Sequence, residues 1–363
     1  MRRNYLFAVV MGALFIGGIF SNPLMAQASG GPKGAAASSA CDRECLNGFV
    51  DKYLDAVVAH DPSRLSVTKA VKFTENGQRL ALGEGFWKTA SARGTYKLYV
   101  DDVEAGQVGF MGTMREAGQP VIVAVRLKIR RGEIAEIETM VARGSMSERG
   151  AGNLEKLGAP DHIYLEDVPP AERVSRLDVI KTANKYFSGM QLNDGKGDYS
   201  FFADDCNRLE NGMQTTNNPN PMQGVSGTSN APPAPVSRRY DPGLKPTMYS
   251  SAWPCKDQFQ SGLLHFVTRI RDRRYVVVDR ERGLSFGFVF FDHAAGDTRT
   301  FQTPDGRTVT GGPQTPWTWE ICELFKVQGG QIHRIEAVLN QVPYGMGSGW
   351  SSWEQSRSDQ PQW

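Results

Sequence analysis

The chain has 363 residues, of which 40% are hydrophobic, and 41 basic against 39 acidic residues leave a net charge of +2. This balance argues against a nucleic acid as partner, because domains that bind nucleic acids carry a clear excess of Lys and Arg. The length exceeds what one hydrophobic core usually organises, so two domains are expected.

The N-terminus reads as a targeting segment. Two arginines precede an apolar run, residues 5–20, and small residues with Ala-x-Ala-like spacing follow it. This order predicts a secretory signal peptide over residues 1–28, and hence a periplasmic or extracellular protein. The alternative is a membrane anchor. Because the apolar run is short and rich in glycine, we expect no stable membrane span after processing. Residues 29–40, rich in Gly, Ala and Ser, predict a flexible tether.

An internal duplication organises the rest of the chain. Matching segments occur at 75–77 and 210–212 (Glu-Asn-Gly), at 97–106 and 274–283, and at 127–138 (LKIRRGEIAEIE) and 325–336 (FKVQGGQIHRIE). The spacing grows from 135 (210 − 75) to 177 (274 − 97) and then to 198 (325 − 127). Copy two therefore carries two insertions, near residues 213–254 and 293–315, and loops this long often serve as lids or binding segments.

Each copy predicts a helix followed by a meander of strands. Residues 44–60 have apolar side chains at helical spacing, and four strand-like runs separated by turn residues lie between residues 95 and 143. Helices first and antiparallel strands afterwards predict an α+β fold with the helices on one face of the sheet.

The duplicated unit resembles the nuclear transport factor 2-like superfamily, which includes SnoaL-like and ketosteroid-isomerase-like domains. The closing pattern K-[IV]-x-x-G-[EQ]-I-x-x-I-E carries this resemblance, together with the order of elements. It implies two tandem cone-shaped domains, each a curved antiparallel sheet packed on N-terminal helices, with a small apolar molecule in the mouth. It also implies that the sheets form an internal pseudo-dimer, which predicts a monomer. The chain is similar, too, to an uncharacterised duplicated family of bacteria and fungi ending in VLNQVPYGMGSGW, which implies no chemistry.

The domain boundaries follow from these patterns. We place copy one at residues 41–148, a linker at 149–171, copy two at 172–345 and a C-terminal tail at 346–363.

Copy two is also similar to ketosteroid isomerase, and three positions carry this similarity. After a matching FADD at residues 202–205, Glu210 stands where the isomerase has its general-base Asp. Tyr186 and Glu323 correspond to the two groups that stabilise the enolate oxygen, a phenol and a protonated carboxylic acid. The similarity implies cofactor-independent proton transfer with these three catalytic residues. Because Glu replaces Asp at both carboxyl positions, it does not imply steroid specificity.

A structural role for these residues is the alternative. Copy one has Tyr53 and Glu75 at the positions equivalent to Tyr186 and Glu210, but Val125 at the position equivalent to Glu323. In addition, a one-residue shift in strand register would turn Glu323 toward solvent. We therefore expect an exported isomerase or lyase, such as a dehydratase, that acts on a small apolar carbonyl compound. The alternative is a non-catalytic protein of the cell envelope that binds a small molecule or a partner.

Five further residues are candidates for binding. His265 and His293 occur only in copy two, near the insertions, and are either ligand contacts or solvent-exposed. Trp317 and Trp319 line a pocket or belong to the core. Asn211 contacts a ligand or supplies a turn with positive φ. The histidine spacing predicts no metal site.

Five cysteines in an exported chain suggest disulfides and one spare thiol. Cys41 and Cys45 are close enough in sequence to bridge at the start of a helix. A bridge from Cys206 to Cys255 would close 49 residues (255 − 206) and stabilise the fold by about 4 kcal/mol. Cys322 lies in an apolar strand pattern, which predicts a buried thiol. The sequence leaves the pairing open.

Two further features of the sequence are a basic run and a pair of equivalent glutamates. The densest basic run, RIRDRR at residues 269–274, reads as the solvated end of a strand, with an anion site as the alternative. Glu138 and Glu336 end the matching segments 127–138 and 325–336, and we expect them at the surface or in a contact between the copies.

Overall fold

The computed structural model describes residues 41–219, 251–296, 299–302 and 308–363, which belong to one compact unit. The expected signal peptide and tether lie outside the described residues, as do most of the first insertion and part of the second. Among the helices of the described residues, none is long and apolar enough to cross a membrane.

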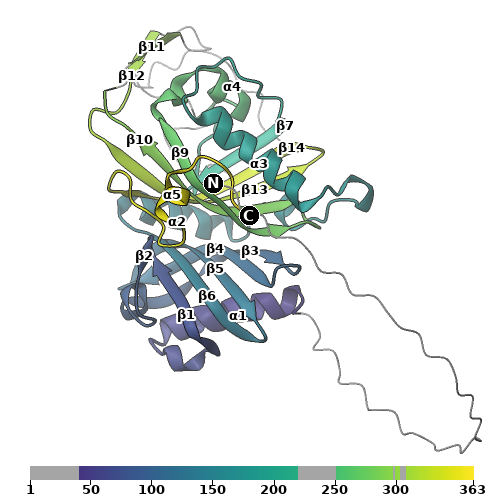
Figure 1. Ribbon diagram of the computed structural model, residues 1–363, viewed down its shortest axis with the longest axis vertical. Helices are drawn as coiled ribbons and strands as arrows, with labels where there is room; N and C mark the ends of the chain where they lie inside the picture. Colours follow the sequence, from purple (N-terminus) through teal and green to yellow (C-terminus); the bar gives the residue numbers. More distant parts are fainter. Residues whose placement is uncertain (1–40, 220–250, 297–298, 303–307) are drawn as a thin grey trace, which may run out of the picture. The chain divides into compact units, whose positions relative to one another are not determined.

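Copy one is a helix followed by a six-stranded sheet (Figure 1). The sheet order is β2-β1-β6-β5-β4-β3. The elements are α1 (Arg43–Val58), η1 (Pro62–Arg64), β1 (Val67–Glu75), β2 (Gln78–Arg79), η2 (Gly85–Lys88), β3 (Ala90–Asp102), β4 (Gln107–Glu116), β5 (Gln119–Arg130) and β6 (Glu133–Ala142).

Copy two repeats this plan with the order β8-β7-β14-β13-β10-β9. Its elements are α3 (Arg176–Met190), β7 (Phe202–Glu210), β8 (Met213–Gln214), α4 (Cys255–Gln260), η5 (Leu263–Phe266), β9 (Arg269–Asp279), β10 (Leu284–His293), the separate hairpin β11 (Arg299–Gln302) and β12 (Thr308–Gly311), β13 (Trp317–Gln328) and β14 (Gln331–Val342). Between the copies lie α2 (Ser145–Leu157), η3 (His162–Tyr164) and η4 (Pro170–Glu172), and α5 (Trp353–Arg357) lies in the tail.

The predicted α+β fold with two tandem curved sheets is confirmed. One refinement concerns strand direction: β1 pairs with β6, and β7 with β14, in parallel, whereas the other neighbouring pairs are antiparallel. The sheets are therefore mixed, because the first strand of each copy lies beside the last one and runs the same way.

The strand registers repeat the spacing found in the sequence. Glu75 lies opposite Thr139 and Glu210 opposite Ala337, so offsets of 135 (210 − 75) and 198 (337 − 139) superpose the two parallel pairs. The Glu-Asn-Gly tripeptides form equivalent two-residue hairpin turns, because Asn and Gly both have positive φ in each copy. The repeated tripeptide is thus a repeated turn.

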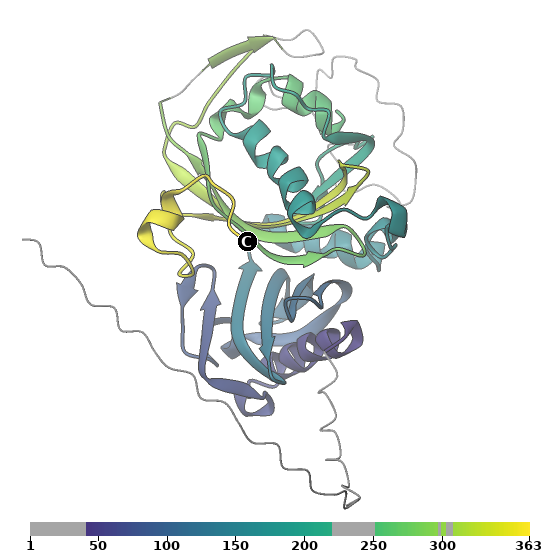
Figure 2. The same ribbon diagram turned by 45° about the vertical axis from the view of Figure 1, so that its right-hand side comes forward.

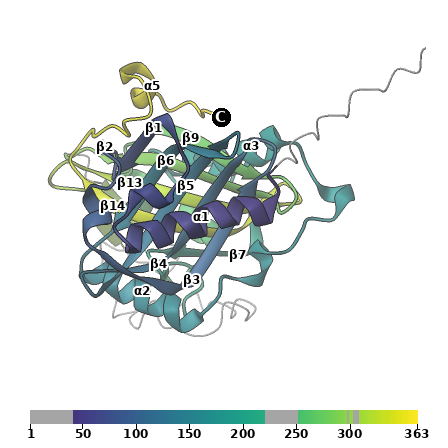
Figure 3. The ribbon, with the colours of Figure 1, turned by 90° about the horizontal axis from the view of Figure 1, so that it is seen from below.

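A helix covers the inner face of each sheet. Asp42 caps α1 and Ser175 caps α3 by accepting backbone N–H groups. In Figure 3 α1 lies across the first sheet, and in Figure 2 α3 lies within the curve of the second. The strands alternate as expected: Ile321 and Phe325 belong to the core around α3, whereas Cys322 and Leu324 point to the other face of the sheet. Glu323 therefore faces inward.

The outer faces of the two sheets pack on each other. Leu98, Met140, Phe286 and Leu324 belong to one buried cluster with members from both sheets. Polar contacts cross this interface as well. Arg274 donates to Glu138 at 2.5 Å, and the Tyr96 hydroxyl donates to Glu336 at 2.8 Å. Of the two positions considered for Glu138 and Glu336, a surface position and a contact between the copies, the structure shows the contact.

The basic run of residues 269–274 is buried, and its prediction as a solvated strand end is wrong. Arg271 and Asp272 are 0% exposed, because the C-terminal tail covers β9. The backbone N–H of Tyr275 donates to Gln362, and that of Asp272 to Ser358. Arg271 pairs with Asp292 at 2.8 Å. The tail thus supplies hydrogen-bond partners to an edge strand on which Arg269, Arg271 and Arg274 have acidic partners, whereas Arg273 donates to neutral groups such as Asn184 and Ser188.

Candidate functional site

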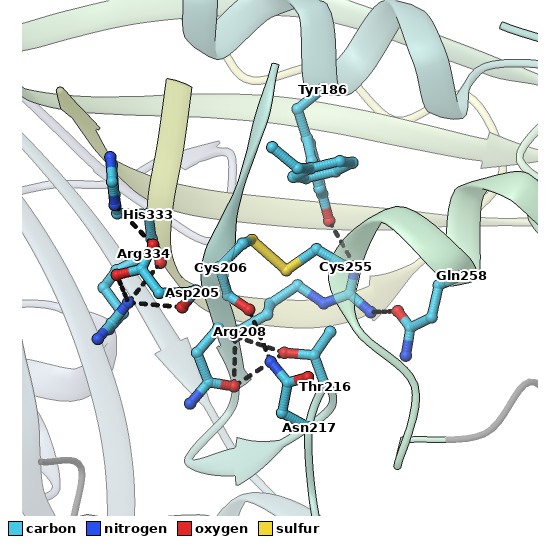
Figure 4. Close-up of a disulfide and its surroundings, with 12 residues drawn as sticks. Tyr186, Asp205, Cys206, Arg208, Thr216, Asn217, Cys255, Gln258, His333 and Arg334 are labelled. Atoms are coloured by element: carbon cyan, nitrogen blue, oxygen red, sulfur yellow. Dashed lines mark hydrogen bonds and ion pairs between the residues drawn. A yellow bond between two sulfur atoms is a disulfide. The ribbon is translucent and has the colours of Figure 1, made fainter. Parts of the chain in front are cut away.

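The candidate site lies between α3 and the inner face of the second sheet, where the structure places an arginine that the sequence prediction did not include. Arg208, on β7, is 1% exposed. It donates to the Tyr186 hydroxyl at 3.0 Å and to Gln258 at 2.6 Å, and its Nε lies 3.3 Å from a Glu210 carboxylate oxygen. Figure 4 shows Tyr186 pointing toward the guanidinium and Gln258 holding its other side. A guanidinium keeps its positive charge at all physiological pH values, so the candidate site contains a permanent buried cation.

Glu323 adjoins the same cluster from β13. It is 2% exposed, and its Oε2 has no hydrogen-bond partner among the described residues. Burial, and then the charge of Glu210, raise the pKa of Glu323 to about 8, while Arg208 and the Tyr186 hydroxyl act in the opposite direction. Glu323 is therefore neutral at pH 7. Burial also holds the pKa of Tyr186 well above its ordinary value, so the phenol keeps its proton.

A cavity of about 290 Å³ opens beside this cluster. Arg208 and Glu210 line it, whereas Tyr186 and Glu323 are not among its lining residues and lie behind this first layer. The other polar lining residues are Asn211, Thr215 and His293. The apolar lining residues are Met146, Met190, Met213, Leu264, Phe266, Val267, Phe291, Trp319, Ile321 and Leu339. The cavity is thus an apolar space with one ion pair at its wall, a combination typical of small-molecule sites.

The candidate binding residues have different surroundings. His293 is 0% exposed, lines the cavity and stacks on Trp317 with ring centroids 3.7 Å apart. Trp319 also lines the cavity and meets Trp317 edge-on at 4.8 Å. His265 is equally buried, on η5, but is not a lining residue. Neither histidine is solvent-exposed.

Asn211 touches the cavity but has clear structural bonds. Its φ is 45°, and its side chain both donates to and accepts from the backbone of Leu339 at 2.9 Å. Asn76 makes the equivalent pair of bonds with Val141 in copy one. These contacts favour the turn interpretation, since they occur in both copies.

Both disulfides considered from the sequence are present. Cys206 on β7 is joined to Cys255 at the start of α4, and Cys41 to Cys45. Cys322 is a buried free thiol, as predicted. The first bridge fixes α4, whose Phe259 packs on Tyr186 at 5.2 Å and whose Gln258 holds Arg208 (Figure 4). Helix α4, which follows the first insertion, thereby becomes part of the site.

Copy one has the same arrangement of elements but lacks the equivalents of Arg208 and Glu323. Its residue equivalent to Arg208 is Phe73, at the same offset of 135 (208 − 73), and Val125 replaces Glu323. The Glu75 carboxylate accepts from the backbone of Phe86 at 2.6 Å, and the Tyr53 hydroxyl is bonded to Thr139 at 3.0 Å. Copy one therefore ties its Tyr and Glu into the fold, and the polar cluster is particular to copy two.

No group of three or more His, Cys, Asp or Glu side chains that could hold a metal ion occurs within the described part of the chain. The arrangement in copy two is a buried guanidinium that contacts the Glu210 carboxylate and the Tyr186 hydroxyl. Such groups can accept a proton and stabilise a developing negative oxygen.

The comparisons with known proteins locate copy two without assigning an activity. Residues 172–339 match a family described as "Domain of unknown function (DUF8021)". No curated protein matches the chain. A de novo designed protein with a curved β-sheet is 18% identical, with a TM-score of 0.24, over 32% of this chain and 98% of its own. AclR, a proposed hydroxylase from Streptomyces galilaeus, is 14% identical, with a TM-score of 0.24, over 36% and 92%. Similarity this low carries no functional argument.

Proposed function

We propose that the protein is an exported, cofactor-independent proton-transfer enzyme, an isomerase or lyase, that acts on a small neutral carbonyl compound in the cavity of copy two. Glu210 is the base, and Arg208 with Tyr186 stabilises the enolate oxygen. The observation that carries the proposal is the buried Arg208, which contacts both Glu210 and Tyr186 at the wall of an apolar cavity.

The charges balance through such a reaction. Before proton transfer, the charge of Arg208 is matched by Glu210, and Glu323 is neutral. When Glu210 takes a proton from the carbon next to the carbonyl, the electron pair of the C–H bond moves toward the carbonyl oxygen. The negative charge thus passes from Glu210 to an oxygen that Arg208 can stabilise. Return of the proton to the γ-carbon of a β,γ-unsaturated carbonyl compound completes an isomerisation. Loss of a β-hydroxyl group together with this proton, as water, completes a dehydration.

The same balance favours a neutral substrate. Arg208 already has Glu210 as its partner, so a carboxylate on the substrate would bring a second negative charge into the cavity. Uncompensated charge in a dry cavity is costly. The attraction between Arg208 and the oxygen of a neutral carbonyl compound becomes strong only when that oxygen becomes negative. The interaction is therefore stronger in the transition state than in the bound substrate, as catalysis requires.

Fold and covalent structure are compatible with the rest of the proposal. A helix followed by a curved sheet, present twice, supports assignment to the nuclear transport factor 2-like superfamily. Two disulfides are typical of an oxidising compartment, which supports export.

One observation favours the alternative, a non-catalytic protein of the cell envelope that binds a small molecule. Arg208 already occupies the Tyr186 hydroxyl, and neither Tyr186 nor Glu323 is a lining residue of the cavity. A purely binding site would need only the ion pair and the apolar walls.

Hydrogen–deuterium exchange separates these functions. 4-Phenylcyclohexanone is a neutral, largely apolar ketone, and NMR in D2O follows the loss of its protons next to the carbonyl. We expect the protein to accelerate this loss and Glu210→Gln to reduce the acceleration by about 10²-fold or more. The matched control is Glu75→Gln, at the equivalent position of copy one, which should leave the rate unchanged. Binding of the ketone without accelerated exchange would favour the binding protein.

A further inference from the structure

A second polar feature of the cavity is not used by the proposed proton transfer. His293 ends β10 and lies opposite Trp317. Its ring is held between Trp317, at 3.7 Å and 7° from parallel, and Phe266, at 5.6 Å and 25°. This stacking fixes the plane of the imidazole, so its two nitrogens have defined directions.

Within the described residues, the His293 imidazole has no hydrogen-bond partner of normal geometry. This holds for both ring nitrogens, and His293 is 0% exposed. The backbones of Phe291 and Trp317 lie near enough to act on it, but burial dominates and lowers the pKa of His293 to about 4. The ring is therefore neutral at pH 7, with one donor and one acceptor. A buried polar group without a partner is destabilising, which points to a ligand as the missing partner.

His293 and the acid–base cluster lie at opposite ends of the site. On paired strands β10 and β13, Gly287 is opposite Glu323 and His293 is opposite Trp317. Six residues separate the two positions along each strand, and the pairing of Glu210 with Ala337 and of Ala337 with Glu323 places Glu210 at the Glu323 level of the sheet. Between them, Phe291, Trp319 and Ile321 provide apolar walls. The cavity is thus polar at both ends and apolar between them.

We propose that the cavity takes an elongated, neutral, largely apolar molecule with two polar groups, a carbonyl at Arg208 and Glu210 and a hydroxyl or second carbonyl at His293. The inference rests on the proposed function for the carbonyl end only. The volume of about 290 Å³ equals that of about ten water molecules at ~30 Å³ each, so the ligand is a compact one- or two-ring compound.

Two ketones that differ in one group test this assignment. 4-(4-Hydroxyphenyl)cyclohexanone carries a hydroxyl at the end opposite its carbonyl, and 4-phenylcyclohexanone lacks it. Titration calorimetry with the full-length protein should show about fivefold to tenfold tighter binding of the hydroxylated ketone, which corresponds to one hydrogen bond. His293→Phe keeps a ring on Trp317 but removes both nitrogens. It should abolish the preference and change the affinity for 4-phenylcyclohexanone by less than about twofold.

The control is His162→Phe, the same substitution at a histidine whose side chain is 58% exposed, and it should keep the preference. Equal binding of the two ketones by the unsubstituted protein, an unchanged preference in His293→Phe, or no binding of either ketone would overturn the assignment. Because binding is measured without turnover, a preference that depends on His293 supports the inference even if Glu210 accelerates no exchange.

Discussion

Glu323 is the residue whose protonation most directly links the candidate site to stability. Its pKa rises from 4.5 in the unfolded chain to about 8 in the folded protein. Between these values the folded protein holds one more proton than the unfolded chain, so the free energy of unfolding falls as pH rises from 4.5 to 8. Glu323→Gln has no such proton to lose. Relative to the unsubstituted protein, we expect the variant to gain about 2–4 kcal/mol of stability between pH 5 and pH 8, measured by urea unfolding.

Glu133→Gln, at the exposed first residue of β6, should show no pH-dependent gain. A gain for Glu323→Gln that is the same at pH 5 and pH 8 would contradict a neutral Glu323 in the folded protein.

At this scale the sequence located the acidic residues and missed the cation. Strand alternation predicted that Glu323 faces inward, and the similarity to ketosteroid isomerase singled out Glu210 and Tyr186. Arg208 was missed because a charged residue in a strand is ordinarily read as solvent-facing. The duplication held the missing signal, since Arg208 aligns with Phe73, which is 2% exposed in the core of copy one. A charged residue at the core position of a repeat indicates a buried charge with partners.

Among the elements, α4 depends on its disulfide for its place in the site. Cys206–Cys255 closes 49 residues, and α4 packs Phe259 on Tyr186. Replacing both cysteines by Ser should lower the free energy of unfolding by about 4 kcal/mol and weaken the binding of 4-phenylcyclohexanone, because α4 helps to hold Arg208. The matched control replaces Cys41 and Cys45, which close a much shorter loop, and should cost about 2 kcal/mol without a change in affinity. An unchanged affinity in the variant that lacks Cys206–Cys255 would show that α4 is held by packing alone.

The boundaries of the elements could be predicted from hydrophobic periodicity and turn residues, but the burial of β9 could not. Its alternation of charged and apolar residues is what a half-exposed strand would show. The tail, which pairs with β9 from nearly 90 residues away, covers the basic end of this strand, and Glu138 of copy one covers Arg274. Contacts of such long range have no local signature in a single sequence.

For the molecule as a whole, the two copies form a pseudo-symmetric pair. Arg43 at the start of α1 binds Asp279 of copy two, and Arg176 at the start of α3 binds Asp102 of copy one. The arginines are 133 apart (176 − 43), the same offset as between Tyr53 and Tyr186 (186 − 53). The aspartates are 177 apart (279 − 102), which is the offset of the segments 97–106 and 274–283. Each copy therefore offers the same two residues to the other, as the partners of a two-fold dimer do.

The closest approach between the sheets gives the sharpest test of this packing. Gly109 of copy one lies beneath the ring of Phe286 of copy two, and a methyl group on Gly109 would come within 2.9 Å of that ring. Gly109→Ala should therefore destabilise the protein by about 1–3 kcal/mol, because the ring has no free space into which to move. Gly152→Ala is the control, since a methyl group there meets nothing within 4 Å and favours helix α2.

Shortening the opposing side chain should then relieve the clash. In a Phe286→Leu background, whose own cost is about 1 kcal/mol, we expect Gly109→Ala to cost at least 0.5 kcal/mol less than it does alone, because these residues touch across the two sheets. Urea unfolding of the four proteins measures this coupling, and a single shared transition is expected in each, since neither sheet can expose its outer face alone. Additive costs, or two separate transitions, would mean that the copies fold as independent domains in loose contact.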